Sequence, residues 1–470
     1  MRHNTQSLAL LVLVIASILS AGPVAGQTLE EIVVTAQKRA ESAQDVPIAI
    51  TAFDSTALDR NQIENVDDLA DFVPNLQFGT FSSTATAAIR GIGYTNTTAG
   101  GDPGVALHLD GVYIARPIAT VFRLWDLERM EVLRGPQGTL YGRNTTGGSI
   151  NFITRQPGDE FGGEIDVSYG EFNHYQVRGV VNVPFSDKVA GRFGAAVDQA
   201  DGYQENAFPG GTEGGDRDSV TLRGQLQIDV SDGLDISLGI HHAQVGGVGL
   251  TTESRFPYPT SPAVNWVGVP PPFVNTIFSD AFLNRPDVAA FLGPRGISTA
   301  DDVRAELGLP PGGLLSPSDP NFAGLTNDLR ANQVTKNTPE SNDQEFTAGI
   351  ATLNWDTGLG ALKWTTAYVE TSFDNFIDLD ASERTLINLL LEEEQEQVST
   401  EITLAYTGDG NMQWIVGAYF FSEDATRFST IFADDFVRNA ILFGRAAGFR
   451  VGGDVEAESS AVFGLSLIHI

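Results

Sequence analysis

The sequence predicts a transmembrane antiparallel β-barrel that follows a small mixed α/β domain. After the first 20 residues no stretch is apolar for long enough to cross a bilayer as a helix, which takes about 20 residues. From residue 163 onward, strand-length segments are separated by turns that are alternately short and long. In the clearest segment, 220–230, apolar and polar side chains alternate strictly. Such alternation is typical of a barrel strand, although it also fits a soluble β-sandwich.

Composition narrows the class of protein. The chain has 470 residues, 42% of them hydrophobic, no cysteine and a formal net charge of −32. The missing cysteines exclude a disulfide scaffold and any cysteine-based nucleophile or zinc site, and they fit an oxidising compartment. The negative charge argues against nucleic-acid binding. It indicates solvated loops, or loops that share divalent cations with lipopolysaccharide.

The N-terminus has the pattern of a secretory signal peptide, residues 1–26. Arg2 and His3 precede the apolar run Leu8–Leu19, and Val24-Ala25-Gly26 offers small residues at a cleavage site. An uncleaved membrane anchor is the alternative.

Residues 27–43 contain a short segment rich in β-branched residues, Ile32-Val33-Val34-Thr35-Ala36. Polar residues flank it, so we expect it to be extended, exposed and mobile. An exposed strand at a flexible terminus suits capture at the sheet edge of a partner. The alternative is that it forms the first strand of the domain that follows.

Residues 44–157 predict a compact mixed domain. A helix is expected to begin at Asn65 and to end before Pro74. Asp110-Gly111 predicts a tight turn between two short strands. The strands are expected at 46–53, 76–81, 85–90, 105–109, 112–114, 127–133 and 149–154.

Several motifs in this region resemble, in order, the plug of TonB-dependent receptors. They are Ile89-Arg90-Gly91, Asp110-Gly111-Val112, the run Glu128 to Gly142 (ERMEVLRGPQGTLYG) and Gly147-Gly148-Ser149-Ile150-Asn151. The resemblance covers about 120 residues. It implies that the domain lies inside the lumen of a 22-stranded barrel, and that TonB, with its inner-membrane energising complex, binds Ile32 to Ala36.

The resemblance also implies residue roles. Arg90, Glu131 and Arg134 are expected to form a polar lock between plug and barrel wall, or else to pair within the plug, because an unpaired buried charge is costly. Tyr94, Asn96, Arg116 and Arg123 are expected in apical loops that bind substrate; alternatively they pack or are solvated. The glycine-rich stretches lack the Gly-Lys-Ser/Thr ending of a phosphate loop.

Residues 158–470 predict the N-terminal part of the barrel. About ten strands are expected where 22 are needed, and the chain ends on Ile470, within an expected strand and without a terminal aromatic residue. We therefore expect a fragment that could not insert alone, and we leave open whether the last residues are native. The expected strands are 163–170, 174–184, 188–199, 218–230, 234–244, 344–356, 361–373, 395–407, 411–423 and 455–464.

The leading functional hypothesis is TonB-dependent transport of a scarce nutrient, most simply a ferric siderophore, across the outer membrane. Cobalamin, haem or a saccharide could be carried in the same way, and a passive porin or a barrel adhesin is the alternative of another class. A secreted enzyme is disfavoured because the sequence has no nucleophile elbow, no HExxH and no acid/base pair in context. We expect no catalytic residue, metal or cofactor; the expected contacts are TonB, an extracellular iron complex, lipid and lipopolysaccharide.

Overall fold

The computed structural model describes residues 33–35, 38–39, 41–44, 46–63, 66–81, 84–93, 101–116, 125–249, 333–334, 336, 338–379, 387–406, 412–433 and 448–468. The predicted signal peptide, residues 1–26, lies outside these residues.

A five-stranded mixed sheet forms the centre of the N-terminal domain. Its order is β3-β9-β10-β7-β8, in which β10 and β7 run parallel and the other neighbours antiparallel. The predicted strand at 46–53 begins only at Ile50. The strands are β3 (Ile50–Asp54), β7 (Val105–Leu109), β8 (Val112–Ile114), β9 (Leu127–Arg134) and β10 (Gly148–Thr154).

Smaller elements complete the domain. The helix predicted from Asn65 is a short 3₁₀ helix, η1 (Asp67–Asp71), whose N-cap, Val66, has no capping side chain. Helix α2 (Ser55–Arg60) was not predicted, although Asp54 caps it by accepting a 2.7 Å hydrogen bond from the Ala57 amide. Among the described residues, no helix is long and apolar enough to cross a membrane. The other elements are β1 (Val33–Val34), β2 (Glu41–Ser42), β4 (Leu76–Phe81), β5 (Thr84–Ile89), β6 (Ile92–Gly93) and α3 (Gly138–Tyr141).

The backbone of the plug requires glycine in one tight turn and at one close approach of two strands. Asp110 and Gly111 have φ of 49° and 86°, so the predicted tight turn has both central residues at positive φ and joins β7 to β8. At Gly148 a Cβ atom would lie 2.1 Å from the Leu133 carbonyl oxygen. Only glycine therefore allows β10 to lie this close to β9.

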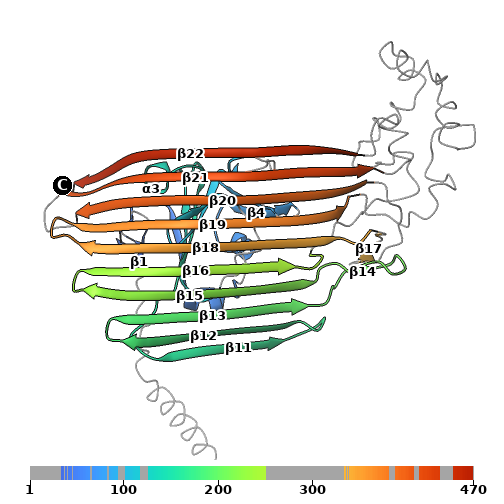
Figure 1. The fold of residues 1–470 in the computed structure, drawn as a ribbon, viewed down its shortest axis with the longest axis horizontal. Helices are drawn as coiled ribbons and strands as arrows, with labels where there is room; N and C mark the ends of the chain where they lie inside the picture. The colour runs from blue at the N-terminus through green and yellow to red at the C-terminus, as the bar shows by residue number, and fades with distance from the viewer. Residues whose placement is uncertain are drawn as a thin grey trace, which may run out of the picture.

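A ten-stranded antiparallel sheet follows, in which each strand pairs with the next one of the sheet along the chain (Figure 1). All ten predicted strands are present. They are β11 (Gly162–Tyr169), β12 (Tyr175–Ser186), β13 (Val189–Ala200), β15 (Arg217–Ser231), β16 (Leu234–Gly246), β18 (Ser341–Asp356), β19 (Ala361–Asp378), β20 (Ile387–Tyr406), β21 (Met412–Ala433) and β22 (Gly448–Ile468). Two short strands outside it, β14 (Glu205–Asn206) and β17 (Gln333–Val334), pair in parallel.

The last strands are much longer than predicted. β20, β21 and β22 have 20, 22 and 21 residues, and most of the extra length lies at the end of the sheet where β20 and β22 begin. The polar run around Glu393 and Gln395 has the composition of a loop. The run nevertheless forms a strand, because its inward-facing side chains are buried in the lumen. Glu393 is 4% exposed and Gln395 is 2% exposed.

The N-terminal domain packs against one face of this sheet. Leu107 and Ile150 of its central sheet share a buried cluster with Phe346, Ala348 and Val369 of β18 and β19. Figure 1 shows the same arrangement, with the blue and teal N-terminal elements behind the strands. The face that carries these contacts is therefore the lumen side of the sheet.

The opposite face carries the pattern of a membrane-spanning surface. Near the short turns, Tyr406 and Trp414 stack with their ring centroids 5.9 Å apart. About ten residues further along their strands, Glu396 and Asp424 are cross-strand partners, and Ile402 and other exposed apolar side chains lie between. A transmembrane β-strand needs about 9–11 residues, so the aromatic pair and the carboxylate pair bracket one bilayer core.

Candidate functional site

The described part of the N-terminal box, residues 33–35, is folded back onto the plug. Strand β1 pairs antiparallel with β2, in the register Val33 with Ser42 and Val34 with Glu41. Val34 is fully buried in a cluster that contains Leu133 and Ile415, whereas Val33 is 48% exposed. The expectation of an exposed segment is therefore wrong for Val34, because its side chain fills an apolar gap between plug and wall.

Thr35 is held by polar contacts to the plug. Its amide and its hydroxyl both donate to Glu131 Oε1, at 2.8 and 3.1 Å, and the Tyr141 hydroxyl donates to its carbonyl oxygen at 3.0 Å. Arg129 neutralises Glu131, with Nε 2.9 Å from the same carboxylate. Both backbone groups of Thr35 are occupied, so Thr35 cannot pair with a partner strand while it is docked.

The residues after the box bind the barrel wall. Lys38 Nζ lies 2.9 Å from Glu401 on β20 and 5.2 Å from the centre of the Tyr141 ring. Arg39 donates to Gln413 on β21 at 2.7 Å. We call the box together with Lys38 and Arg39 the box segment. This segment connects plug and wall directly.

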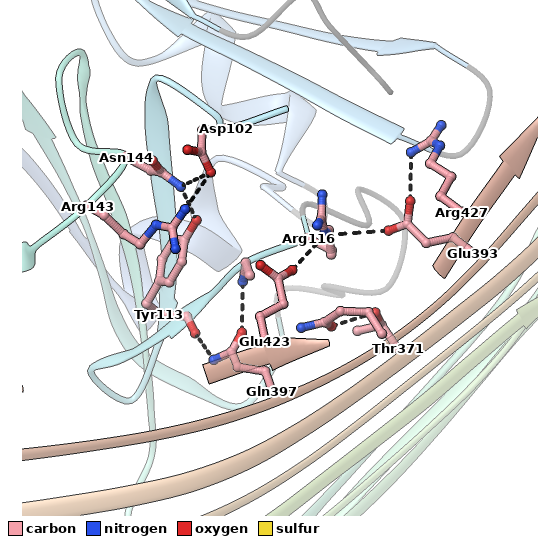
Figure 2. Close-up of polar contacts among 12 residues, drawn as sticks. Asp102, Tyr113, Arg116, Arg143, Asn144, Thr371, Glu393, Gln397, Glu423 and Arg427 are labelled. Carbon is pink, nitrogen blue, oxygen red and sulfur yellow. Dashed lines mark hydrogen bonds and ion pairs between the residues drawn. The ribbon is translucent and has the colours of Figure 1, made fainter. Parts of the chain in front are cut away.

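A buried charge network fixes the end of β8 to the wall (Figure 2). Arg116 Nε lies 2.8 Å from Glu423 and 3.9 Å from Glu393, and Arg427 donates to Glu393 at 2.8 Å. All four residues are buried. Two positive and two negative charges alternate, which is the arrangement that makes burial of charges tolerable.

A second network lies on the other side of the plug. Asp126 forms ion pairs with Arg192 on β13 and with Arg223 on β15, the latter at 3.8 Å. Asp110 lies 3.5 Å from His241 on β16. Burial alone would raise the pKa of Asp110, but His241 and hydrogen bonds from Thr154 hold that pKa below its usual value. The plug is therefore fastened to at least five strands of the wall.

A cavity of about 870 Å³ separates plug and wall between these fastenings. Its walls are β15, β16, β18, β19 and β20, with the Asp110–Gly111 turn and Arg129 on the plug side. Thr35 and Lys38 are part of its lining, so the docked box forms one of its boundaries. Most of the residues that line it are polar or charged.

Residues 42–149 match the family model described as TonB-dependent Receptor Plug Domain. The chain is 30% identical over 157 residues to the pesticin receptor of Yersinia pestis, covering 33% of this chain and 23% of the relative. It is 32% identical over 150 residues to the iron-regulated outer membrane virulence protein of Vibrio cholerae, covering 31% and 23%. Residues 42–149 thus form a plug domain of the kind found in TonB-dependent receptors.

Solved structures of such receptors share its fold. The ferric yersiniabactin uptake receptor from Yersinia pestis superposes with a TM-score of 0.57 at 14% identity, over 89% of this chain and 61% of that one. The ferripyoverdine receptor of Pseudomonas aeruginosa gives 0.58 at 14%, over 93% and 51%. The chain thus matches 23% of the length of each of these two curated relatives and between half and two thirds of these structures. The chain is a protein of the outer membrane.

Glu131, one of the three predicted lock residues, takes the alternative role of pairing within the plug. Glu131 is fully buried but contacts Thr35 and Arg129, so it pairs with the box and the plug rather than with the wall. The Arg134 Nε atom has no hydrogen-bond partner among the described residues, and its amide donates to Ala49. Arg90, at φ 55°, is exposed and its guanidinium lies beside Gly135.

The predicted ligand-binding residues are only partly described. Tyr94, Asn96 and Arg123, like Ile32 and Ala36 of the box, lie outside the described residues. Arg116 is engaged by Glu423 and Glu393 in the wall. The sequence analysis missed Tyr141, Asp126, Arg192, Glu393 and Glu423. The sequence marks each of them as a charged or polar residue at a position that is otherwise apolar or faces inward. Residue spacing does not identify the partner of any of them.

Proposed function

We propose that this receptor imports a ferric siderophore across the outer membrane, driven by TonB and its inner-membrane energising complex. The observation that carries the proposal is the docked box. Its backbone is engaged by the plug at Thr35, and the Val34 side chain contacts plug and wall together. A segment held by a few polar contacts at a cavity boundary is suited to be removed by an external pull.

The substrate class is supported by the relatives. Those matched by sequence include a ferripyoverdine receptor, and the solved structures include receptors for ferric yersiniabactin and alcaligin. We propose that the iron complex binds outside, at apical loops that include Tyr94, Asn96, Arg116 and Arg123. Cobalamin, haem and saccharides are the alternative cargoes. The proposal includes no enzymatic step.

The proposed organisation assigns residues 27–43 to the periplasmic segment that TonB binds through Ile32 to Ala36. Residues 44–157 would form the plug and 158–470 part of the barrel. The family match at 42–149 supports the plug boundaries.

Uptake of ⁵⁵Fe from a panel of ferric siderophores tests the proposal. We expect uptake that stops when the proton-motive force is collapsed or TonB is deleted, and expression that rises on iron starvation. Val34→Pro should abolish uptake and leave binding at the cell surface intact, because proline removes a strand donor. Uptake that survives a protonophore would indicate a passive porin, and surface binding of cells without uptake would indicate an adhesin.

A further inference from the structure

Four buried aromatic rings form a column from the barrel wall to the docked box. The ring centroids of Phe421 and Tyr113 are 5.9 Å apart, those of Tyr113 and His108 5.7 Å, and those of His108 and Tyr141 5.3 Å. None of the four residues is more than 8% exposed. Aromatic pairs at this spacing are in direct contact, so a shift of one ring displaces the next.

The column ends on the box. The Tyr141 hydroxyl donates to the carbonyl oxygen of Thr35 at 3.0 Å, and Lys38 lies over the Tyr141 ring. Midway, His108 Nδ1 forms a 2.9 Å hydrogen bond with Ser149 Oγ, which fixes the imidazole to β10. The orientation of Tyr141 thus depends on rings that lie deeper in the plug.

Tyr113, the first plug ring of the column, is held at its hydroxyl and at its backbone. The Tyr113 hydroxyl accepts a 2.7 Å hydrogen bond from Asn144, which also donates to Asp102 at 3.1 Å (Figure 2). Gln397 on β20 bonds the backbone on both sides of Ile114, to the Tyr113 carbonyl at 2.6 Å and the Ala115 amide at 3.1 Å.

Arg116 lies one residue beyond this bonded stretch. Its ion pairs with Glu423 and Glu393, together with the bonds from Gln397, set the position of β8 relative to the wall. Tyr113 is three residues away on the same rigid segment. Any change at Arg116 that moves β8 must move the first plug ring of the column.

We propose that this column couples the Arg116 network to docking of the box, with His108 and Tyr141 as positioning residues that control its release. The proposal rests on the transport function above, because it describes how an event at the outer end of the plug would free the segment that TonB binds. The two residues after the box contact the wall near the short turns, Lys38 at Glu401 and Arg39 at Gln413. These contacts do not involve β8.

The chain has no cysteine, so one introduced thiol can report on docking. We would place it at the buried Val34 (Val34→Cys) and measure the rate of labelling by a membrane-impermeant maleimide, with the full-length receptor in outer-membrane vesicles opened to the periplasmic side. Arg116→Met and Tyr141→Phe should each raise the rate about three- to tenfold, the effect of losing one or two hydrogen bonds. Arg116→Met should add nothing further in the Tyr141→Phe background.

Arg192→Met is the matched control, because Arg192 also forms a buried plug–wall ion pair, with Asp126, but lies off the column. It should leave labelling of the Val34→Cys thiol unchanged. A thiol at Asp232, in the turn between β15 and β16, should label equally in all variants and so identify any variant that fails to fold.

Additive effects of Arg116→Met and Tyr141→Phe, or an equal effect of Arg192→Met, would overturn the proposal. His108→Ala provides a second route, since it leaves both hydrogen-bonded ends in place but should also remove the effect of Arg116→Met. The assay contains neither substrate nor TonB. A failure of coupling is therefore distinct from a failure of the transport function, which only the uptake measurement addresses.

Discussion

Glu131 shows how a single buried charge can hold a releasable segment. Its carboxylate is fully buried and is bonded by the Thr35 amide, the Thr35 hydroxyl and the Arg129 guanidinium. A buried carboxylate is stable only while such partners remain. When the box leaves, Glu131 loses the Thr35 contacts but keeps Arg129, so release costs hydrogen bonds and leaves no uncompensated charge.

Glu131→Ala should undock the box. It removes the acceptor of the Thr35 amide and leaves Arg129 only the half-exposed Glu128, and removing one partner of a buried ion pair costs about 3–5 kcal/mol. We expect labelling of the Val34→Cys thiol to rise at least tenfold. Glu128→Ala is the control, because Glu128 also contacts Arg129 but is half exposed, where such pairs contribute about 0–1 kcal/mol. Equal labelling in the two variants would show that Glu131 does not hold the box.

His108 predicts a pH dependence of the plug. Burial, followed by the charge of Lys38, lowers its pKa from 6.5 to about 3. Between these two pH values the unfolded chain binds a proton that the folded plug does not, so stability falls as pH falls through this window. The loss is on the order of 2 kcal/mol at pH 5 for a pKa shift of this size.

Nuclear magnetic resonance of ¹³C-histidine in detergent micelles would check this value. The His108 ring signal should keep its neutral position from pH 7 to pH 4 and be absent from His108→Phe, which should also lose part of the pH dependence of stability. Titration of that signal near pH 6.5 would contradict the burial of the imidazole.

At the scale of elements, local patterns predicted the strands but not their lengths or contacts. All ten sheet strands and the Asp110–Gly111 turn were predicted, because alternation and positive φ are local properties. The outer halves of β20 to β22 were missed, since burial of Glu393 depends on Arg427 and Arg116 from other elements. Pairing of Thr35 with Glu131, 96 residues apart, is not encoded in any local pattern.

The outer face of β20 makes a testable prediction about the membrane boundary. Ile402, 44% exposed, lies between the Tyr406 ring and Glu396, whereas Glu394 lies on the same face beyond Glu396. Ile402→Arg should destabilise insertion by about 2–4 kcal/mol and Glu394→Arg by about 0–1 kcal/mol, the costs of a lipid-facing arginine at the midplane and at the interface. Folding yield of the full-length receptor in liposomes measures the difference. Equal yields would place the bilayer elsewhere on these strands.

At the scale of the whole molecule, fastenings of the plug surround a cavity that the box helps to close. The Arg116 and Asp126 networks hold the plug to β20, β21, β13 and β15, and the cavity lies between them along β15 to β20. Removing the box would take away Thr35 and Lys38 from the cavity lining without breaking either network. Transport along this side would therefore need a smaller rearrangement than expulsion of the plug.

This arrangement predicts that a covalent bond between box and wall blocks transport. Lys38→Cys with Glu401→Cys replaces the 2.9 Å ion pair by two thiols, the only ones in the chain, which a cleavable bis-maleimide can join. Cross-linked receptor should bind ⁵⁵Fe-siderophore at the cell surface but not import it, because the box can no longer leave the wall. Reductive cleavage of the linker should restore import, and each single-cysteine variant should be insensitive to the reagent. Import through the cross-linked receptor would mean that the box need not leave the wall. The part of the cavity lined by Lys38 would then not belong to the transport path.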